Sequence, residues 1–227
     1  MSDKLRDKQL AQLKEAARIF MRPMERLPFP VVMEAMTGCE IIPIQKNQYD
    51  KLLLSKLAEA CKQTVKESHR HAYQANRPND VSTQVEKRLQ SHLEDCNVSV
   101  EIPRAPGGRG GGGGYPDCLL WLRKKPSYLE VKVSHEQNIT RGSARNFFYQ
   151  PTAKSKIQHP SRHLLAGFAL REKPGKKWIL TSWKIVDLFY LRVKLKPEYN
   201  ADNTEIYRKE LILAEGDKNG IKMSKIL

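Results

Sequence analysis

The sequence has few acidic residues and no long apolar run. Aspartate and glutamate together number 25, against 40 lysines and arginines, which gives a formal net charge of +15. The longest apolar stretches, such as 164–170, are too short to cross a bilayer, and Met1–Gln9 lacks the apolar core of a secretory signal. We therefore expect neither a membrane-spanning nor a secreted protein. The positive charge favours a polyanionic partner, with nucleic acid as the first candidate and an anionic membrane surface as the second.

Cysteine is also scarce, and its positions are scattered. No two of the four cysteines form a CxxC pair: Cys39, Cys61, Cys96 and Cys118. We therefore expect reduced thiols in a cytoplasmic protein rather than disulfides or a zinc site. Apolar residues make up 40% and charged residues 29% of the chain, which is typical of a folded domain and not of a disordered one.

A glycine tract, Gly107–Gly114, is interrupted only by Arg109. It lacks the GK[ST] of a phosphate-binding loop, and no helix is expected after it, so a nucleotide-binding loop is not predicted. Two interpretations stay open. The tract is either a flexible connector between strands or a mobile loop beside the functional site, where it would place Arg104 and Arg109 near nucleic-acid phosphates.

Helical periodicity dominates the first part of the chain. Apolar residues recur at helical spacing in a first helix, at Leu10, Leu13, Ala17 and Phe20. Three prolines then predict an irregular connector: Pro23, Pro28 and Pro30. A second helix is expected from about Gln48 to Tyr73 with Asn47 as its cap, and a third from about Ser82 to Glu94.

After the third helix the apolar pattern changes to the alternation of strands. Alternation or a short apolar run predicts five strands, at 98–102, 118–122, 128–134, 163–170 and 178–180. Residues 143–156 are expected to be helical in part. For 185–195, periodicity does not decide between strand and helix.

One predicted hairpin, 117–134, brings reactive side chains together. Because side chains alternate across a strand, Glu130 and Lys132 point to one face, while the apolar residues between them point to the core. With a turn at 123–126, Asp117 pairs with Lys132 and is the diagonal neighbour of Glu130. One face of the hairpin is therefore expected to carry Asp117, Glu130 and Lys132 within contact range.

Two converging carboxylates repel one another unless a positive charge lies between them. Mg2+ meets this need, because it prefers oxygen ligands and keeps positions for water and for a substrate phosphate. We expect Asp117 and Glu130 to bind Mg2+ and Lys132 to hold or activate the attacking water. The alternative interpretation is a surface hairpin with a salt bridge between Glu130 and Lys132.

Pro116-Asp117 followed by Glu130-Val131-Lys132 resembles the motif of the PD-(D/E)XK nuclease superfamily, and the chain is most similar in size and layout to a type II restriction endonuclease. The resemblance implies an α/β fold, a restriction-endonuclease-like mixed β-sheet core flanked by helices, here with an N-terminal helical region. It also implies that Asp117 and Glu130 bind Mg2+ and that Lys132 assists the nucleophile. Many family members carry a helical glutamate that reaches the metal, a role that falls on Glu86 here, with Glu94 as the alternative.

We expect a single domain over 1–227, with a mainly helical region at 1–80, the catalytic core at about 82–195 and a C-terminal extension at 196–227. The resemblance implies sequence-specific cleavage of double-stranded DNA, leaving 5′-phosphate and 3′-hydroxyl ends, with a DNA methyltransferase that protects the host. A homodimer is expected because two-fold symmetry in the protein matches a palindromic site. The alternatives are a structure-specific repair or junction-resolving nuclease of the same superfamily, and a non-catalytic DNA-binding protein.

A basic segment follows the hairpin. Residues 141–177 contain nine lysines and arginines and a single acid, Glu172, with aromatic residues among the bases. We expect this segment to contact DNA phosphates. The candidate DNA-binding residues, which include two from the glycine-rich region, are Arg104, Arg109, Arg141, Arg145, Lys154 and Lys156. The alternative is a solvated basic face with the aromatic side chains in the core.

Overall fold

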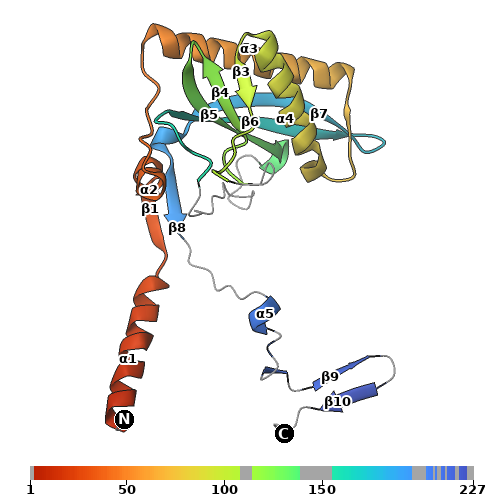
Figure 1. Cartoon of the computed structure of the whole chain (residues 1–227). Helices are drawn as coiled ribbons and strands as arrows, with labels where there is room; N and C mark the ends of the chain where they lie inside the picture. The colour runs from red at the N-terminus through yellow and green to blue at the C-terminus, as the bar shows by residue number, and fades with distance from the viewer. Residues whose placement is uncertain are drawn as a thin grey trace. The chain divides into compact units, whose positions relative to one another are not determined.

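The structure, a computed structural model, describes residues 3–107, 114–138, 155–195, 203–206, 208, 211–212, 214–217 and 220–223. The chain divides into two compact units. Arg26–Val193 forms the larger unit, and Met1–Glu25 together with Lys194–Leu227 forms the other. The larger unit contains the main sheet and the helices that cover it (Figure 1).

A mixed six-stranded sheet is the framework of the larger unit, with the strand order β2-β7-β6-β5-β4-β3. Neighbouring strands are antiparallel except β5 and β6, which run parallel. The strand bounds are β2 Tyr73–Gln74, β3 Ser99–Glu101, β4 Cys118–Leu122, β5 Lys125–His135, β6 Arg162–Lys173 and β7 Lys177–Asp187. The strand predicted at 163–170 is thus confirmed as the neighbour of the strand that carries Glu130 and Lys132.

Two long helices cover one face of this sheet (Figure 1), α3 (Gln48–Arg70) and α4 (Pro78–Asp95). The predicted cap of α3 is confirmed, because the side chain of Asn47 accepts a hydrogen bond from the backbone N–H of Asp50 at 2.8 Å. The apolar stripes of both helices are buried against alternate strand residues, in a core that includes Leu53, Leu57, Val85, Leu89, Cys118, Leu120, Leu129 and Val131. The apolar face predicted for the hairpin is therefore confirmed.

The opposite face of the sheet carries a smaller apolar cluster with α2 (Phe29–Thr37) and the short 3-10 helix η2 (Leu188–Tyr190). The prediction of an irregular connector near the three prolines was wrong for this segment. Pro28 is the N-cap of α2 and Pro30 lies in its first turn, where a backbone N–H has no partner within the helix. Helices on both faces of a mixed sheet make a restriction-endonuclease-like α/β fold, as predicted.

Several element boundaries differ from the predictions. The strand predicted at 178–180 extends over the whole of β7, because it pairs along the length of β6. The ambiguous segment 185–195 is divided between the end of β7, η2 and β8 (Arg192–Leu195). Strand β8 pairs with β1 (Met24–Pro28) in a separate two-stranded sheet. Of the segment predicted to be partly helical, 143–154 lies outside the described residues and 155–156 belong to no helix.

The smaller unit contains α1 (Asp3–Phe20), α5 (Asn203–Ile206) and the antiparallel pair β9 (Ala214–Asp217) and β10 (Gly220–Met223). The first predicted helix is thus confirmed, and its apolar residues Leu10, Leu13 and Phe20 are exposed. No helix in the described part of the chain has the length and apolar character needed to span a membrane. All four cysteines have free thiols, as expected.

Candidate active site

The β4–β5 hairpin has a tighter turn than the sequence predicted. Arg123 and Lys124 form a two-residue turn with φ of 49° and 62°, and Leu122 pairs with Lys125. A type I′ turn needs such left-handed backbone at both positions and usually has Gly or Asn there, so an Arg-Lys pair carries no turn signal. The predicted turn at 123–126 was therefore wrong.

The register of the hairpin changes with the turn. Cys118 pairs with Leu129, which brings Asp117 level with Glu130 and not with Lys132 as predicted. The shift is two residues, and side chains alternate with a period of two, so no side chain changes face. Asp117, Glu130 and Lys132 consequently still share one face of the hairpin.

Lys132 and Glu130 contact one another, and Asp117 is hydrogen-bonded to the backbone of the strand that carries them. The Nζ of Lys132 lies 2.5 Å from Oε1 of Glu130. Oδ2 of Asp117 accepts a hydrogen bond from the backbone N–H of Val131 at 2.8 Å, which holds this carboxylate against β5. Glu130 is only 2% exposed, whereas the side chain of Lys132 is 42% exposed. The acid is therefore buried while the amine reaches solvent.

Burial raises the pKa of Glu130 to about 7, and repulsion from Asp117 adds to the shift, while the hydrogen bond from Lys132 opposes both. Oε2 of Glu130 is buried, and no donor among the described residues reaches it. A buried carboxylate oxygen without a donor, next to a second carboxylate, fits a divalent cation. The cation would satisfy that oxygen and offset the repulsion between the two acids.

The protein ligands for such a cation are few. Within the described ranges, no group of three His, Cys, Asp or Glu side chains is arranged to hold a metal ion. Two carboxylates are nonetheless a sufficient protein contribution for Mg2+, because this ion keeps several waters and takes further oxygens from a substrate phosphate. The pair Asp117 and Glu130 therefore suits Mg2+ better than a metal that needs a closed protein cage.

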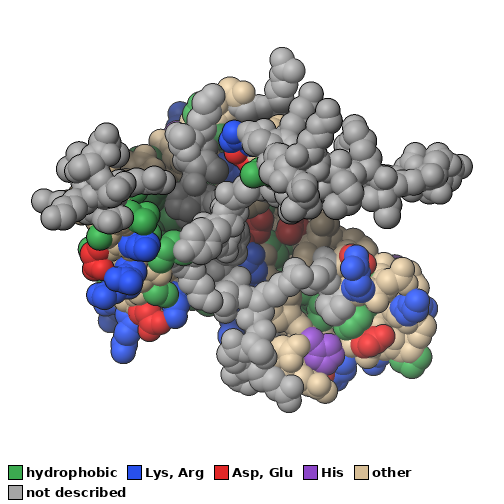
Figure 2. Space-filling model, turned by 90° about the horizontal axis from the view of Figure 1, so that it is seen from below, with side chains coloured by type: hydrophobic (Ala, Val, Ile, Leu, Met, Phe, Trp, Pro, Cys, Tyr) green, Lys and Arg blue, Asp and Glu red, His purple; other side chains and the backbone are tan. Residues whose placement is uncertain are grey.

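Glu86 of α4 interacts electrostatically with one of these carboxylates, that of Asp117. Burial raises its pKa to about 7, repulsion from Asp117 adds to the shift, and Lys132 opposes it. Its side chain therefore lies within electrostatic reach of Asp117 and Lys132. Glu94, the alternative position, is exposed near the end of α4. Figure 2 shows acidic (red) and basic (blue) side chains at the surface of the described residues.

Comparisons with known proteins decide the family. A family model described as the type II restriction enzyme MjaV family matches residues 23–210, which is more than half of the chain. The type II restriction enzyme MjaV of Methanocaldococcus jannaschii is 30% identical over 223 residues, which cover 91% of this chain and 96% of that protein. The chain belongs to the MjaV family of type II restriction enzymes. No solved structure matches it.

Membership of the MjaV family confirms the prediction of a type II restriction endonuclease, that is, a site-specific deoxyribonuclease. The family match includes the hairpin with Asp117, Glu130 and Lys132 as well as Glu86 on α4. Neither comparison assigns a role to any residue.

Two of the basic residues predicted to bind DNA in this MjaV-family enzyme are described. Arg104 follows β3 and is exposed. Lys156 is half-buried, and its Nζ donates a hydrogen bond to the backbone carbonyl of Gly114 at 2.8 Å. The other candidates lie outside the described residues: Arg109, Arg141, Arg145 and Lys154.

Gln90 is a neighbour of the site that the sequence analysis missed. It lies one turn after Glu86 on α4, and its side chain donates a hydrogen bond to Sγ of Cys118 at 3.4 Å. Burial raises the pKa of the Cys118 thiol to about 12, so this residue stays neutral next to Asp117. The four-residue spacing from Glu86 could have indicated Gln90, because residues at this spacing share a helix face.

A second contact that sequence patterns missed precedes the β4–β5 hairpin. The hydroxyl of Tyr115 shares a hydrogen bond with Nδ1 of His163, a buried residue of β6. The rings of Phe29 and Tyr128 also pack against this imidazole. Burial lowers the pKa of His163 to about 3, so the imidazole is neutral. This contact holds the chain two residues before Asp117. No local spacing relates Tyr115 to His163, so sequence patterns do not show it.

Proposed function

We propose that this enzyme hydrolyses phosphodiester bonds at a specific sequence of double-stranded DNA, with Asp117, Glu130 and Lys132 as its catalytic residues. The carrying observation is the buried carboxylate of Glu130, which has Lys132 on one oxygen, no described donor on the other, and Asp117 beside it. A surface salt bridge would leave both partners solvated and would need no second acid. The arrangement favours chemistry in which a cation and a phosphate join the site.

Asp117 and Glu130 are the residues that would hold Mg2+, and Glu86 adds a third negative charge that interacts with Asp117. When bound, Mg2+ acidifies a water molecule and neutralises the charge that develops on the scissile phosphate. Raised pKa values of about 7 for Glu130 and Glu86 mean that these groups exchange protons for a cation near neutral pH. Cation binding should therefore release protons from the enzyme.

Lys132 is proposed to orient the attacking water and to offset negative charge in the transition state. Its position on β5, two residues after Glu130, places both side chains on the same face. Its ammonium contacts the buried carboxylate while the side chain remains partly exposed. The positive charge therefore lies at the boundary between the acids and the solvent from which a phosphate approaches.

The remaining expectations are also proposed. They are a homodimer that matches a palindromic site, a cognate DNA methyltransferase in the same restriction system, a cytoplasmic location, and one domain with its catalytic core at about 82–195. The exposed side chain of Arg104 supports a phosphate contact at the end of β3. Phosphate contacts are further proposed for Lys156, Arg109, Arg141, Arg145 and Lys154.

The test is a digest of a plasmid of known sequence with Mg2+, followed by mapping of the ends. A restriction enzyme gives discrete fragments with 5′-phosphate ends, and the Lys132→Ala variant forms them far more slowly in a parallel reaction. A junction-resolving nuclease would leave linear duplex uncut and cleave four-way junctions instead. A protein that binds DNA equally with and without Mg2+ and cuts neither substrate would overturn the proposal.

A further inference from the structure

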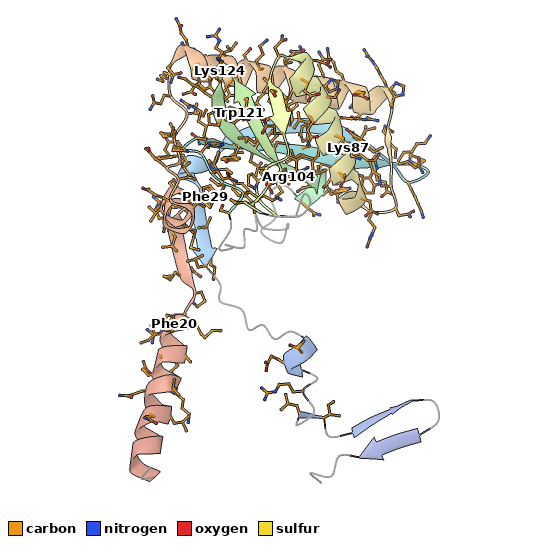
Figure 3. All side chains as sticks on the ribbon, viewed as in Figure 1. Phe20, Phe29, Lys87, Arg104, Trp121 and Lys124 are labelled. Carbon is orange, nitrogen blue, oxygen red and sulfur yellow. The ribbon has the colours of Figure 1, made fainter. Side chains whose placement is uncertain are left out.

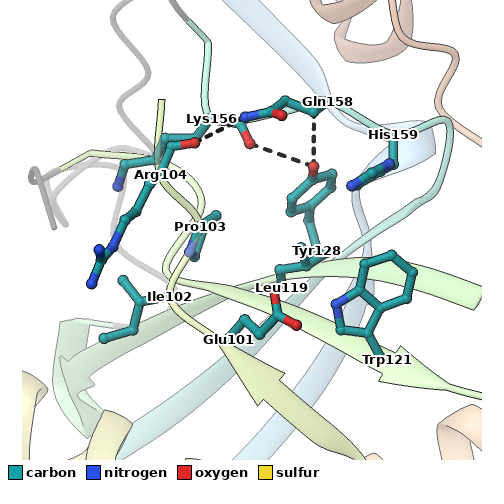
Figure 4. Close-up of a pocket in the computed structure, with 10 residues that line it drawn as sticks. All are labelled: Glu101, Ile102, Pro103, Arg104, Leu119, Trp121, Tyr128, Lys156, Gln158 and His159. Carbon is teal, nitrogen blue, oxygen red and sulfur yellow. Dashed lines mark hydrogen bonds between the residues drawn. The ribbon is translucent and has the colours of Figure 1, made fainter. Parts of the chain in front are cut away.

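A hollow of about 580 Å3 lies on the β4–β5 hairpin (Figure 4). Leu119, Trp121 and Tyr128 of β4 and β5 line it, together with residues from 101–104 and 156–159. Leu119 follows Asp117 by two positions and Tyr128 precedes Glu130 by two, so the hollow is on the same sheet face. Each step of two residues along a strand is about 7 Å. The hollow therefore adjoins the point at which the DNA strand is proposed to be cut.

The lining of the hollow suits a flat ring that carries hydrogen-bonding groups. Leu119, Pro103 and the indole of Trp121 provide apolar surface. The indole N–H of Trp121 is buried without an acceptor among the described residues, and Figure 4 shows it turned toward the hollow. Glu101 contributes an exposed carboxylate to the lining, and a carboxylate can accept hydrogen bonds from exocyclic amino groups of the kind that bases carry.

Positive charge lies next to these ring-binding surfaces. Arg104 and Lys156 both line the hollow, and Glu101 is the one acid among its described lining residues. The phosphates that flank a base in a DNA strand are groups that such cations bind. A neutral ring with anionic groups on both sides is the chemistry of a nucleotide within a DNA strand.

The wall at 156–159 is held in place by hydrogen bonds. The Tyr128 hydroxyl accepts one from the backbone N–H of Gln158 at 2.9 Å and donates one to the carbonyl of Lys156 at 3.4 Å (Figure 4). The side chain of Gln158 donates another to the carbonyl of Arg104 at 2.9 Å. The hollow is therefore formed before any ligand binds, which lowers the entropic cost of binding.

We propose that this hollow binds one unstacked nucleobase of the substrate DNA, next to the scissile phosphate. The inference rests on the proposed function and adds a binding site to it. Its volume lies within the range of about 300–1,000 Å3 found for sites that bury small organic ligands. A base stacked in a duplex presents only its edge, so the base must leave the stack to enter, and it does so most readily where its pairing is already weakened.

The experiment uses duplexes that carry the site mapped in the plasmid digest, with a mismatch placed at each position near the cut in turn. DNA affinity is measured with Ca2+ in place of Mg2+. At one position the mismatch should tighten binding by the unsubstituted (parent) enzyme, because the base that enters the hollow is already unpaired there. Trp121→Ala should lose this gain and bind about 5- to 150-fold more weakly, whereas Trp121→Phe should keep the gain.

Trp183→Ala is the matched control, since it removes another partly buried tryptophan, on β7, outside the hollow. Glu101→Gln changes an exposed side chain and should not affect folding. It should change which mismatched base tightens DNA binding. A parent that cuts plasmid DNA but shows no mismatch gain at any position overturns the base site alone. A free nucleoside monophosphate that binds the DNA-free parent, with no mismatch gain, also overturns it. A parent that cuts no DNA overturns both proposals.

Discussion

The ammonium of Lys132 lies 2.5 Å from a carboxylate oxygen of Glu130, and both side chains point from the same face of β5. Asp117, which directly precedes β4, lies opposite Glu130 and repels its buried carboxylate. A single charge in this group therefore affects both the stability of the fold and the chemistry proposed for it. Changes of charge here should move the two properties separately.

Replacing Lys132 with Ala should lower the rate of DNA cleavage by about 100- to 1,000-fold, because a charge that acts on the reacting phosphate is lost. Binding of specific DNA in Ca2+ should change little. Single-turnover cleavage and DNA affinity measure the two effects. Lys124→Ala is the matched control, since Figure 3 shows Lys124 at the β4–β5 turn, away from Arg104. Equal losses of binding and cleavage would contradict a catalytic role for Lys132.

Replacing Asp117 with Asn should lower activity by more than about 100-fold, because a metal ligand is weakened. The fold should be kept or slightly stabilised, since the repulsion with Glu130 and Glu86 is removed and the amide oxygen still accepts the hydrogen bond from Val131. Thermal melts and DNA affinity with and without Ca2+ measure these effects. A variant that keeps both the Ca2+ enhancement of binding and cleavage with Mg2+ shows that Asp117 is not a ligand.

The metal-free enzyme should lose stability as the pH rises from about 4.5 to above 7. Glu130 and Glu86 have pKa values raised from 4.5 to about 7, so the folded protein holds protons that the unfolded chain has released. The stabilisation is complete below 4.5 and disappears as the pH passes 7. Denaturant midpoints at pH 5 and pH 8 measure the effect. Glu130→Gln should reduce the difference and Mg2+ should reverse it, whereas Glu94→Gln, at an exposed position, should leave it unchanged.

His163 should give the opposite pH dependence at lower pH. Its pKa is lowered from 6.5 to about 3, so below pH 6.5 the unfolded chain takes up a proton that the folded protein does not. Stability is therefore lost as the pH falls from 6.5 towards 3. The measurement is the slope of stability against pH for the parent and for His163→Gln. This slope counts the protons taken up on unfolding, and in His163→Gln it should be smaller by up to one proton. In His71→Gln, a change at an exposed position, the slope should equal that of the parent.

Replacing Arg104 with Ala should weaken binding to all duplexes and lower the slope of log affinity against log salt by about one, as expected for one phosphate contact. DNA affinity over a salt series measures it, with Lys124→Ala as a control of equal charge at the far end of the hairpin (Figure 3). If the two variants show the same slope as the parent, the DNA phosphates lie elsewhere.

The spacing of apolar residues along the sequence was sufficient to predict the long helices and strands. The apolar stripe of α3, its Asn47 cap and the alternation of β5 are consequences of the periods of a helix and a strand, which covalent geometry determines. For the same reason the sequence placed Glu130 and Lys132 on one face. A register error of two residues left this result intact, because a shift by a full period returns each side chain to its face.

Contacts between distant segments depended on the tertiary structure. The Arg123–Lys124 turn is imposed by the pairing of its flanking strands, since neither residue favours positive φ. Which acid of α4 lies within electrostatic reach of Asp117 depends on how the helix packs on the sheet. In the structure Glu86 is within this reach, whereas Glu94 is exposed.

The hollow beside the site depends on the same long-range packing. Its lining comes from 101–104 at the end of β3, from the β4–β5 hairpin and from 156–159, and hydrogen bonds of Tyr128 and Gln158 join these segments. Sequence determines the period and composition of each element by itself. Sheet order and side-chain packing act between elements far apart in the chain, and they decided which of these residues face one another.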